Sequence, residues 1–165
     1  MFAYLALGSN LGDREAYLRA GLYGLARQGV EIVRCASIYA TEPKDVPDQP
    51  WFLNTVALGN TNLEPKLLLQ ACLAVEAEQN RRRDTAKGPR TLDIDIILYD
   101  SRIVRETGLT IPHPRFSSRR FVLDPLAEIA PGFIDPLSGK TIRVLLAECP
   151  DDAEVQRVGS FQDFP

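Results

Sequence analysis

The segment from Gly88 to Tyr99 constrains this chain more than any other, because it places two aspartates in a strand pattern. Apolar residues alternate there with Asp93 and Asp95, and a period of two is typical of a β-strand with one packed face. Both carboxylates then lie side by side on the other face, where like charges repel unless a cation lies between them. Strand interiors are also depleted in Asp. The pattern therefore calls for a compensating partner.

Two interpretations of the paired aspartates are open. A hard divalent ion such as Mg²⁺ binds carboxylate oxygens and commonly shares its coordination with substrate phosphates. Arg90, which follows a Gly-Pro turn and precedes Asp93 by three residues, would add a planar cation suited to phosphate oxygens. Together these groups indicate phosphate transfer. Alternatively, the Asp residues of an edge strand simply face water or pair with nearby arginines.

Length and composition indicate one soluble domain. The 165 residues suffice for a single core, and we expect one domain over residues 1–165 with a C-terminal extension from about residue 142. No apolar run approaches the roughly 20 residues that span a bilayer, and no basic segment precedes the first apolar stretch. We therefore expect a cytoplasmic protein. The three cysteines are widely spaced and predict neither a disulfide framework nor a zinc site.

The charge distribution bears on the kind of ligand. A net charge of −3 and a pI near 5.2 argue against a general nucleic-acid binder. The basic side chains nevertheless gather on both sides of the aspartate strand, namely Arg81, Arg82, Arg83, Lys87, Arg90, Arg115, Arg119 and Arg120. Such a local field suits a small polyanionic ligand. A run of three arginines is also the usual composition of a solvated loop, so both interpretations stay open.

Hydrophobic periodicity predicts the element order β-α-β-β-α-β. Strands are expected at 2–7, 30–39, 52–59 and 92–98, helices at 13–28 and 62–79, and short C-terminal helices at 121–129 and 142–149. The order predicts an α+β fold of the ferredoxin-like sandwich class, with an antiparallel sheet and two helices on one face. Residues 150–165 form an acidic tail with little pattern.

Two loops are candidates for a ligand site. Residues 41–51 contain three prolines, and long loops in compact domains are usually functional. Residues 80–88 are polar throughout and carry three consecutive arginines. We expect this second segment to be a mobile flap that closes over phosphates and excludes water.

Two further side chains admit both a ligand role and a structural role. Asn54 offers a donor and an acceptor to the edge of a heterocycle, or it bonds to neighbouring loop backbone. His113 is the only histidine and lies near Arg115, Arg119 and Arg120. A lone histidine is most often structural. The arginines would disfavour its protonated form here and leave a neutral donor for a phosphate or ribose.

Four segments resemble, in their order and spacing, the 6-hydroxymethyl-7,8-dihydropterin pyrophosphokinase family over about residues 3–129. They are Ala6–Gly12, Gln49–Asn54, Gly88–Asp95, and Ile111–His113 followed by Arg119 and Phe121. The resemblance implies a folate-biosynthesis enzyme that transfers diphosphate from ATP to the hydroxymethyl group of the pterin and releases AMP.

The resemblance also implies roles for individual residues. Asp93 and Asp95 would hold two Mg²⁺ ions that bridge the triphosphate. Arg81 and Arg90 would contact the moving phosphates and, with Asp95, form the catalytic group. The pterin would be bound by Thr41, Pro43, Phe52, Asn54 and Phe121, with the two phenylalanine rings on its two faces. The nucleotide would be bound by Glu76, Arg83, His113 and Arg119.

Two positions depart from the pattern of the family. The flap of the relatives commonly has a tryptophan just before the Gly-Pro-Arg turn, where this chain has Lys87, and the flap here is one residue shorter. An arginine expected shortly before the His113 motif is replaced by Gly108. Flap closure is therefore the least direct inference from the resemblance.

The expected mechanism is in-line attack by the pterin hydroxyl on the β-phosphorus of ATP, with AMP as the leaving group and Asp95 available to accept a proton. An alternative of another class is a non-catalytic nucleotide-sensing module, which would bind ATP without releasing AMP. An RNA-binding module is a further alternative, but the pI and the absence of paired strand aromatics oppose it. We expect a monomer that binds ATP and the pterin, and neither nucleic acid nor membrane.

Overall fold

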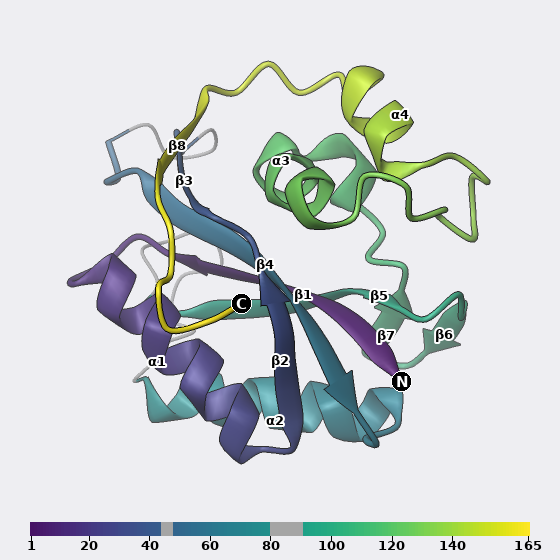
Figure 1. Cartoon of the computed structure of the whole chain (residues 1–165), viewed down its shortest axis with the longest axis horizontal. Helices are drawn as coiled ribbons and strands as arrows, with labels where there is room; N and C mark the ends of the chain where they lie inside the picture. Colours follow the sequence, from purple (N-terminus) through teal and green to yellow (C-terminus); the bar gives the residue numbers. More distant parts are fainter. Residues whose placement is uncertain (44–47, 80–90) are drawn as a thin grey trace.

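The computed structural model describes residues 1–43, 48–79 and 91–165 (Figure 1). The elements are β1 (Phe2–Ser9), α1 (Arg14–Arg27), β2 (Val30–Cys35), β3 (Ile38–Thr41), β4 (Phe52–Thr61), α2 (Pro65–Glu78), β5 (Asp93–Tyr99), β6 (Val104–Glu106), β7 (Leu109–Ile111), η1 (Phe116–Ser118), α3 (Arg120–Ile129), α4 (Ile142–Ala147) and β8 (Val155–Gly159). The α+β class with helices on an antiparallel sheet is confirmed.

The main sheet has six strands, and β1 lies between the two strands of greatest interest. The strand order is β5-β1-β4-β3-β8, and β2 pairs with the far half of the long strand β4. These pairings are antiparallel. The small strands β6 and β7 form a separate hairpin. The aspartates of β5 and Asn54 of β4 therefore flank the same strand.

Helices α1 and α2 cover one face of the sheet (Figure 1). Asp13 caps α1, since its carboxylate accepts the backbone N–H of Ala16 at 3.1 Å. Leucines at helical spacing along α1 are buried in a core shared with Leu68, Cys72 and Val75 of α2. A Cβ at Gly24 would lie 2.7 Å from the Val75 side chain, so glycine permits the close approach of the two helices.

Helix α3 covers the opposite face, and α4 packs against α3 (Figure 1). The sequence predicted both helices but not their place on this second face. A second core joins Val56 and Leu98 of the sheet to Val122 and Leu126 of α3. Glu128 also fastens α3, because its carboxylate accepts hydrogen bonds from the Ser37 backbone and hydroxyl and from the Tyr39 hydroxyl. The sandwich has three layers, with the sheet in the middle.

Several expected elements differ in detail. The single strand expected at 30–39 is two strands, β2 and β3, which pair with successive halves of β4. The N-cap of α2 is Glu64, with Pro65 in the first turn, so the expected start at Asn62 was wrong. Residues 150–165 are not an unpatterned tail, because β8 pairs with β3 and Phe161 is buried in the first core. Their pattern was too short for periodicity to reveal.

Two further sequence expectations concern the whole chain. The three cysteines are free thiols, as expected. Within the ranges described, no helix is long and apolar enough to cross a membrane. The flap predicted at 80–88 and residues 44–47 of the proline-containing loop lie outside the described residues.

Candidate functional site

A row of paired residues crosses the sheet on the face that α3 covers. Gly8 of β1 pairs with Asp93 of β5 on one side and with Asn54 of β4 on the other, and Asn54 pairs in turn with Tyr39 of β3. Directly paired residues share a face, and the bond from Tyr39 to Glu128 of α3 identifies which face it is. The strand pairing therefore brings an aspartate and a carboxamide together on one surface.

The second aspartate lies on the same surface, two residues along. Asp95 pairs with Ala6, which pairs on its other side with Val56. Both aspartates are half-buried, and both lie beside a small residue of β1. The common face that the alternation predicted is therefore present. The neighbours Gly8 and Ala6 place little or no side chain beside the carboxylates.

Gly8 is required by its neighbours rather than by its backbone angles. A Cβ at this position would lie 2.6 Å from the Oδ1 atom of Asn54 and 3.8 Å from the Cδ1 atom of Phe52. Packed atoms do not lie this close together, so Asn54 would have to move. Glycine at this position thus allows the amide and the aromatic ring to lie against the β1 backbone.

The Asn54 side chain has a defined orientation. Its Nδ2 atom donates a hydrogen bond of 2.8 Å to the Thr41 hydroxyl, and both residues are buried. The partner is a side chain of β3, not the loop backbone that the sequence left open. Because Nδ2 points to Thr41, Oδ1 points to Gly8. The amide can present Oδ1 as an acceptor and its second Nδ2 hydrogen as a donor.

The predicted aromatic residues come from two layers. Phe52 is the first residue of β4 and pairs with Thr41. Pro43 follows Thr41 by two residues and is half-buried. Phe121 belongs to the first turn of α3 and packs partly against the second core. The guanidinium carbon of Arg119 lies 5.5 Å from the centroid of the Phe121 ring. A cation–π contact of this kind holds the two side chains next to each other.

Glu76 fastens the aspartate strand from outside. This residue of α2 is buried, and its carboxylate accepts the backbone N–H of Ile94 at 2.8 Å. Ile94 lies between the two aspartates on β5, an edge strand of the main sheet. An unpaired strand edge is otherwise open to wrong pairing. Glu76 therefore satisfies one N–H of that edge and places a third carboxyl group close to the pair.

The electrostatics of this corner suit a cation. Asp93 and Asp95 place two half-buried carboxylates on one face of β5, where a bound cation would offset their mutual repulsion. In the described part of the chain, no three His, Cys, Asp or Glu side chains converge as a metal cage. An ion at Asp93 and Asp95 would complete its coordination with water and phosphate oxygens, which is the usual habit of Mg²⁺. The residues present fit that ion.

His113 lies beside β5 and is neutral. Its backbone N–H donates to the Ile97 carbonyl, and its Nδ1 atom accepts the backbone N–H of Arg115 at 3.1 Å. Burial, followed by the charges of Arg119 and Arg115, lowers the pKa of His113 to about 4. The neutral ring then carries its proton on Nε2 and can donate it to a ligand. The sequence predicted the effect of the arginines, but not the larger effect of burial.

Acidification is expected to destabilise the protein partly through His113. The unfolded chain binds a proton near pH 6.5, whereas the folded chain does so only near pH 4. Stability contributed by the neutral ring is therefore present above pH 6.5 and lost as the pH falls toward 4. Between pH 7 and 5 the full shift would lower the unfolding free energy by roughly 2 kcal/mol, and solvent screening of this partly exposed ring reduces the loss to about 1 kcal/mol. His113→Gln, which cannot be protonated, should lack that loss. Urea unfolding at several pH values measures this, and parallel profiles would contradict it.

Two contacts that the sequence analysis did not predict hold the segment before Phe52. The Arg14 guanidinium donates to the Trp51 carbonyl at 2.6 Å, and the Asn10 amide donates to the Gln49 carboxamide at 2.8 Å. The first joins the start of α1, and the second the turn that follows β1, to residues 49–51. A signal was available, because Asn10 and Gln49 lie in two of the four segments that carry the family resemblance.

Some predicted residues were not tested or are explained differently. Arg81, Arg83 and Arg90 lie within 80–90, outside the described residues, as does Lys87. Gly108 lies between β6 and β7 at φ 78°. Residues with a side chain adopt that angle only with strain. The turn therefore accounts for the glycine where the family pattern has an arginine.

The chain is similar to known proteins over most of its length. A family model for 7,8-dihydro-6-hydroxymethylpterin-pyrophosphokinase (HPPK) matches residues 4–131. A 2-amino-4-hydroxy-6-hydroxymethyldihydropteridine pyrophosphokinase of Methylorubrum extorquens is 41% identical over 157 residues, which cover 94% of this chain and 98% of that protein. The protein of the same name from Bacillus subtilis is 44% identical over 128 residues, 77% of each chain.

A solved structure supports the fold. The wild-type HPPK-DHPS of Plasmodium falciparum with pteroate matches with a TM-score of 0.71 at 14% identity. The match covers 89% of this chain and 42% of that chain, so this chain spans less than half of that protein. At this identity the likeness concerns the fold alone.

Proposed function

The chain belongs to the 7,8-dihydro-6-hydroxymethylpterin-pyrophosphokinase family, and from this premise we propose how its residues carry out the reaction. It is an ATP-dependent diphosphotransferase of folate biosynthesis, which transfers diphosphate to the hydroxymethyl group of 6-hydroxymethyl-7,8-dihydropterin and releases AMP. The observation that carries the proposal is the row Asp93–Gly8–Asn54 on one face of the sheet.

The row suggests how the pterin lies. Strands in a sheet are about 4.8 Å apart, so two spacings separate the backbones of Asn54 and Asp93 by about 10 Å. A bicyclic ring whose amide-like edge bonds to Asn54 would direct its opposite end, with the hydroxymethyl group, toward the aspartates. Gly8 between them leaves room for the ring. The hydroxyl would then lie near the phosphates at β5.

The pterin site proposed here consists of residues on β3, β4 and α3. The Asn54 amide would bond to the polar edge of the ring, with its orientation set by Thr41. Flat heterocycles gain from stacking on aromatic faces, so we assign Phe52 and Phe121 to the two sides of the ring. Pro43 would limit the site at the end of β3.

The nucleotide site proposed here lies around β5. Asp93 and Asp95 would hold two Mg²⁺ ions, which supply neutralisation of the triphosphate charge when bound. The Nε2 proton of His113 would be donated to a phosphate or ribose oxygen, and the guanidinium of Arg119 would attract the phosphates. Glu76 holds the strand that carries the aspartates, and Arg83 is assigned to the nucleotide.

The reaction would need little more than positioning and charge. The hydroxymethyl oxygen attacks the β-phosphorus in line, the bond from that phosphorus to the α-phosphate oxygen breaks, and AMP leaves. A carboxylate oxygen of Asp95 can accept the hydroxyl proton. Arg81 and Arg90 are proposed to follow the transferred group, because arginines stabilise phosphoryl charge without a covalent intermediate.

The other sequence expectations also become proposals. The return of β8 to the main sheet supports a single domain over residues 1–165. A monomeric state, a cytoplasmic location and the absence of nucleic-acid or membrane partners remain predictions. A non-catalytic nucleotide sensor is the alternative function, and it would bind ATP without releasing AMP.

A product assay separates these possibilities. The protein is incubated with ATP, Mg²⁺ and 6-hydroxymethyl-7,8-dihydropterin, and AMP is separated from ADP by chromatography. We expect AMP that depends on the pterin. Release of ADP would instead indicate transfer of the γ-phosphoryl group, and binding of ATP with no nucleotide product would favour the sensor.

A further inference from the structure

Residues 154–165, called the clasp below, lie outside the residues that match the family model and beyond the β-α-β-β-α-β order. The chain returns from α4 to run beside β3 and then crosses α1 (Figure 1). The clasp contains β8 and the two buried or half-buried aromatic residues Phe161 and Phe164. It therefore contacts two elements that border the proposed pterin site.

The first half of the clasp holds β3. In β8, Val155 pairs with Thr41 and Gln156 pairs with Ala40. Just beyond, the Glu154 backbone N–H donates to the Glu42 carboxylate at 2.8 Å, and the Glu42 backbone N–H donates to the Glu154 carbonyl at 3.3 Å. A strand as short as β3 would otherwise be an edge strand, and short edges open readily.

Thr41 transmits this support to the pterin site. Its hydroxyl accepts the hydrogen bond that orients the Asn54 amide. The same residue pairs with Phe52 on the other side of β3. A displacement of β3 away from β4 would therefore weaken the orientation of Asn54 first.

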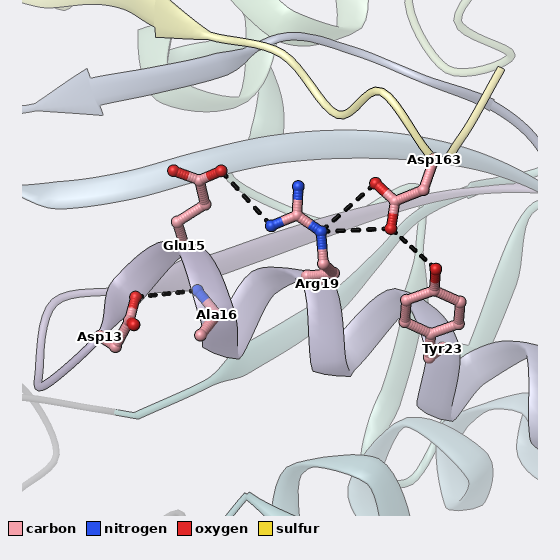
Figure 2. Close-up of polar contacts among 6 residues, drawn as sticks. All are labelled: Asp13, Glu15, Ala16, Arg19, Tyr23 and Asp163. Carbon is pink, nitrogen blue, oxygen red and sulfur yellow. Dashed lines mark hydrogen bonds and ion pairs between the residues drawn. The ribbon is translucent and has the colours of Figure 1, made fainter.

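The second half of the clasp holds α1. The Asp163 carboxylate accepts hydrogen bonds from Arg19 at 3.2 Å and from the Tyr23 hydroxyl at 2.7 Å (Figure 2). The ring centroids of Tyr23 and Phe164 are 5.0 Å apart, and Phe161 is only 6% exposed. Arg19 and Tyr23, which are one turn apart on α1, thus face the clasp.

The start of α1 leads to the same site. Arg14 holds the Trp51 carbonyl, directly before Phe52. The clasp therefore reaches Asn54 through β3 and Phe52 through α1. The aspartates proposed to hold the metal ions are distant from it along the sheet, because β5 and β8 form opposite edges.

We propose that residues 154–165 position the pterin-binding residues Asn54 and Phe52, and so set the affinity for the pterin rather than for ATP. This inference rests on the proposed function. Asp163 is a positioning residue in this scheme, since it acts through Arg19 and Tyr23 on α1. The clasp deepens the assignment of the pterin site by adding a remote support.

The test compares Asp163→Ala, and a chain that ends at Gly159, with the unaltered protein. Asp163→Ala removes only the exposed contacts to α1, so it remains informative where the shortened chain does not fold. Glu148→Ala is the control, because it breaks an exposed ion pair between Glu148, directly after α4, and Lys140, shortly before α4. Steady-state kinetics give KM for each substrate and kcat, and titration of the protein with the pterin gives its Kd.

Asp163→Ala should raise the KM and Kd for the pterin by roughly three- to tenfold, with kcat and the KM for ATP changed by less than about twofold. Asp163→Glu, which keeps the carboxylate, should restore much of the affinity, and the control should resemble the unaltered protein. Unchanged pterin affinity, or an equal rise of both KM values, would overturn the proposal. Absence of AMP with the unaltered protein would instead refute the proposed function, and the titration would still test the clasp.

Discussion

Replacement of Asp95 by alanine is expected to reduce diphosphate transfer by about three orders of magnitude while the fold stays intact. Asp95 lies half-buried on the same strand face as Asp93, beside the small residue Ala6. Its loss removes one of two carboxylates that would hold Mg²⁺, and it leaves the transferred phosphates without that neutralisation. The side chain is not part of either apolar core, so the stability should change little.

The measurement is AMP release at saturating ATP, Mg²⁺ and pterin, with thermal unfolding as a check of the fold. Asp95→Asn keeps the shape and removes the charge, so it should be impaired nearly as much. Glu106→Ala is a matched control, because it removes a carboxylate whose partner is the exposed Lys66 of α2. Near-normal turnover by a folded Asp95→Ala protein would contradict the assignment of this residue to the metal.

Gly8→Ala is the second substitution for which we expect a large effect. The KM for the pterin should rise roughly tenfold or more. The new Cβ would lie 2.6 Å from Oδ1 of Asn54. Asn54 is buried and bonded to Thr41, so its amide can move only by losing that bond. The methyl group would also occupy the surface on which the ring is proposed to lie. We expect the unfolding free energy to fall by about 1–3 kcal/mol.

Two comparisons isolate the cause of the Gly8→Ala effect. Gly132→Ala is the control, because nothing lies within 4 Å of a Cβ there, and it should leave both kinetics and stability unchanged. In an Asn54→Ala background the clash partner is absent, so Gly8→Ala should then destabilise the protein less than it does alone. A Gly8→Ala protein with normal pterin KM would mean that the ring does not lie against β1.

The sequence predicted those parts of the fold that depend on local pattern. The helix start at Asp13 followed from a capping residue ahead of a helical repeat, and the structure has that hydrogen bond. Apart from residues 30–39, the strands and helices through residue 99 were predicted in the right order. The expected strand at 30–39 was wrong because Ala36 and Ser37 interrupt it, and Ser37 bonds to Glu128, which lies 91 residues away in the chain. No local pattern contains such a partner.

The proposed site likewise has features that the sequence could predict and features that it could not. The residue types for phosphate and heterocycle binding could be recognised from the sequence, and so could the effect of nearby arginines on His113. The burial that lowers the pKa of His113 further could not be predicted, because it depends on packing against β5. The support of Asn54 by Thr41 and β8 also escaped prediction, since it joins residues 41, 54 and 155.

The sequence by itself determined that Asp93 and Asp95 share one face of a strand, because side-chain direction in a strand depends on the local backbone alone. It also determined the family, through four short segments in a set order. Only the tertiary structure decided what lies beside that face. The register of β1 against β4 and β5 places Gly8 between Asp93 and Asn54. A shift of one residue would turn those side chains to the opposite face, and long-range core packing is what prevents it.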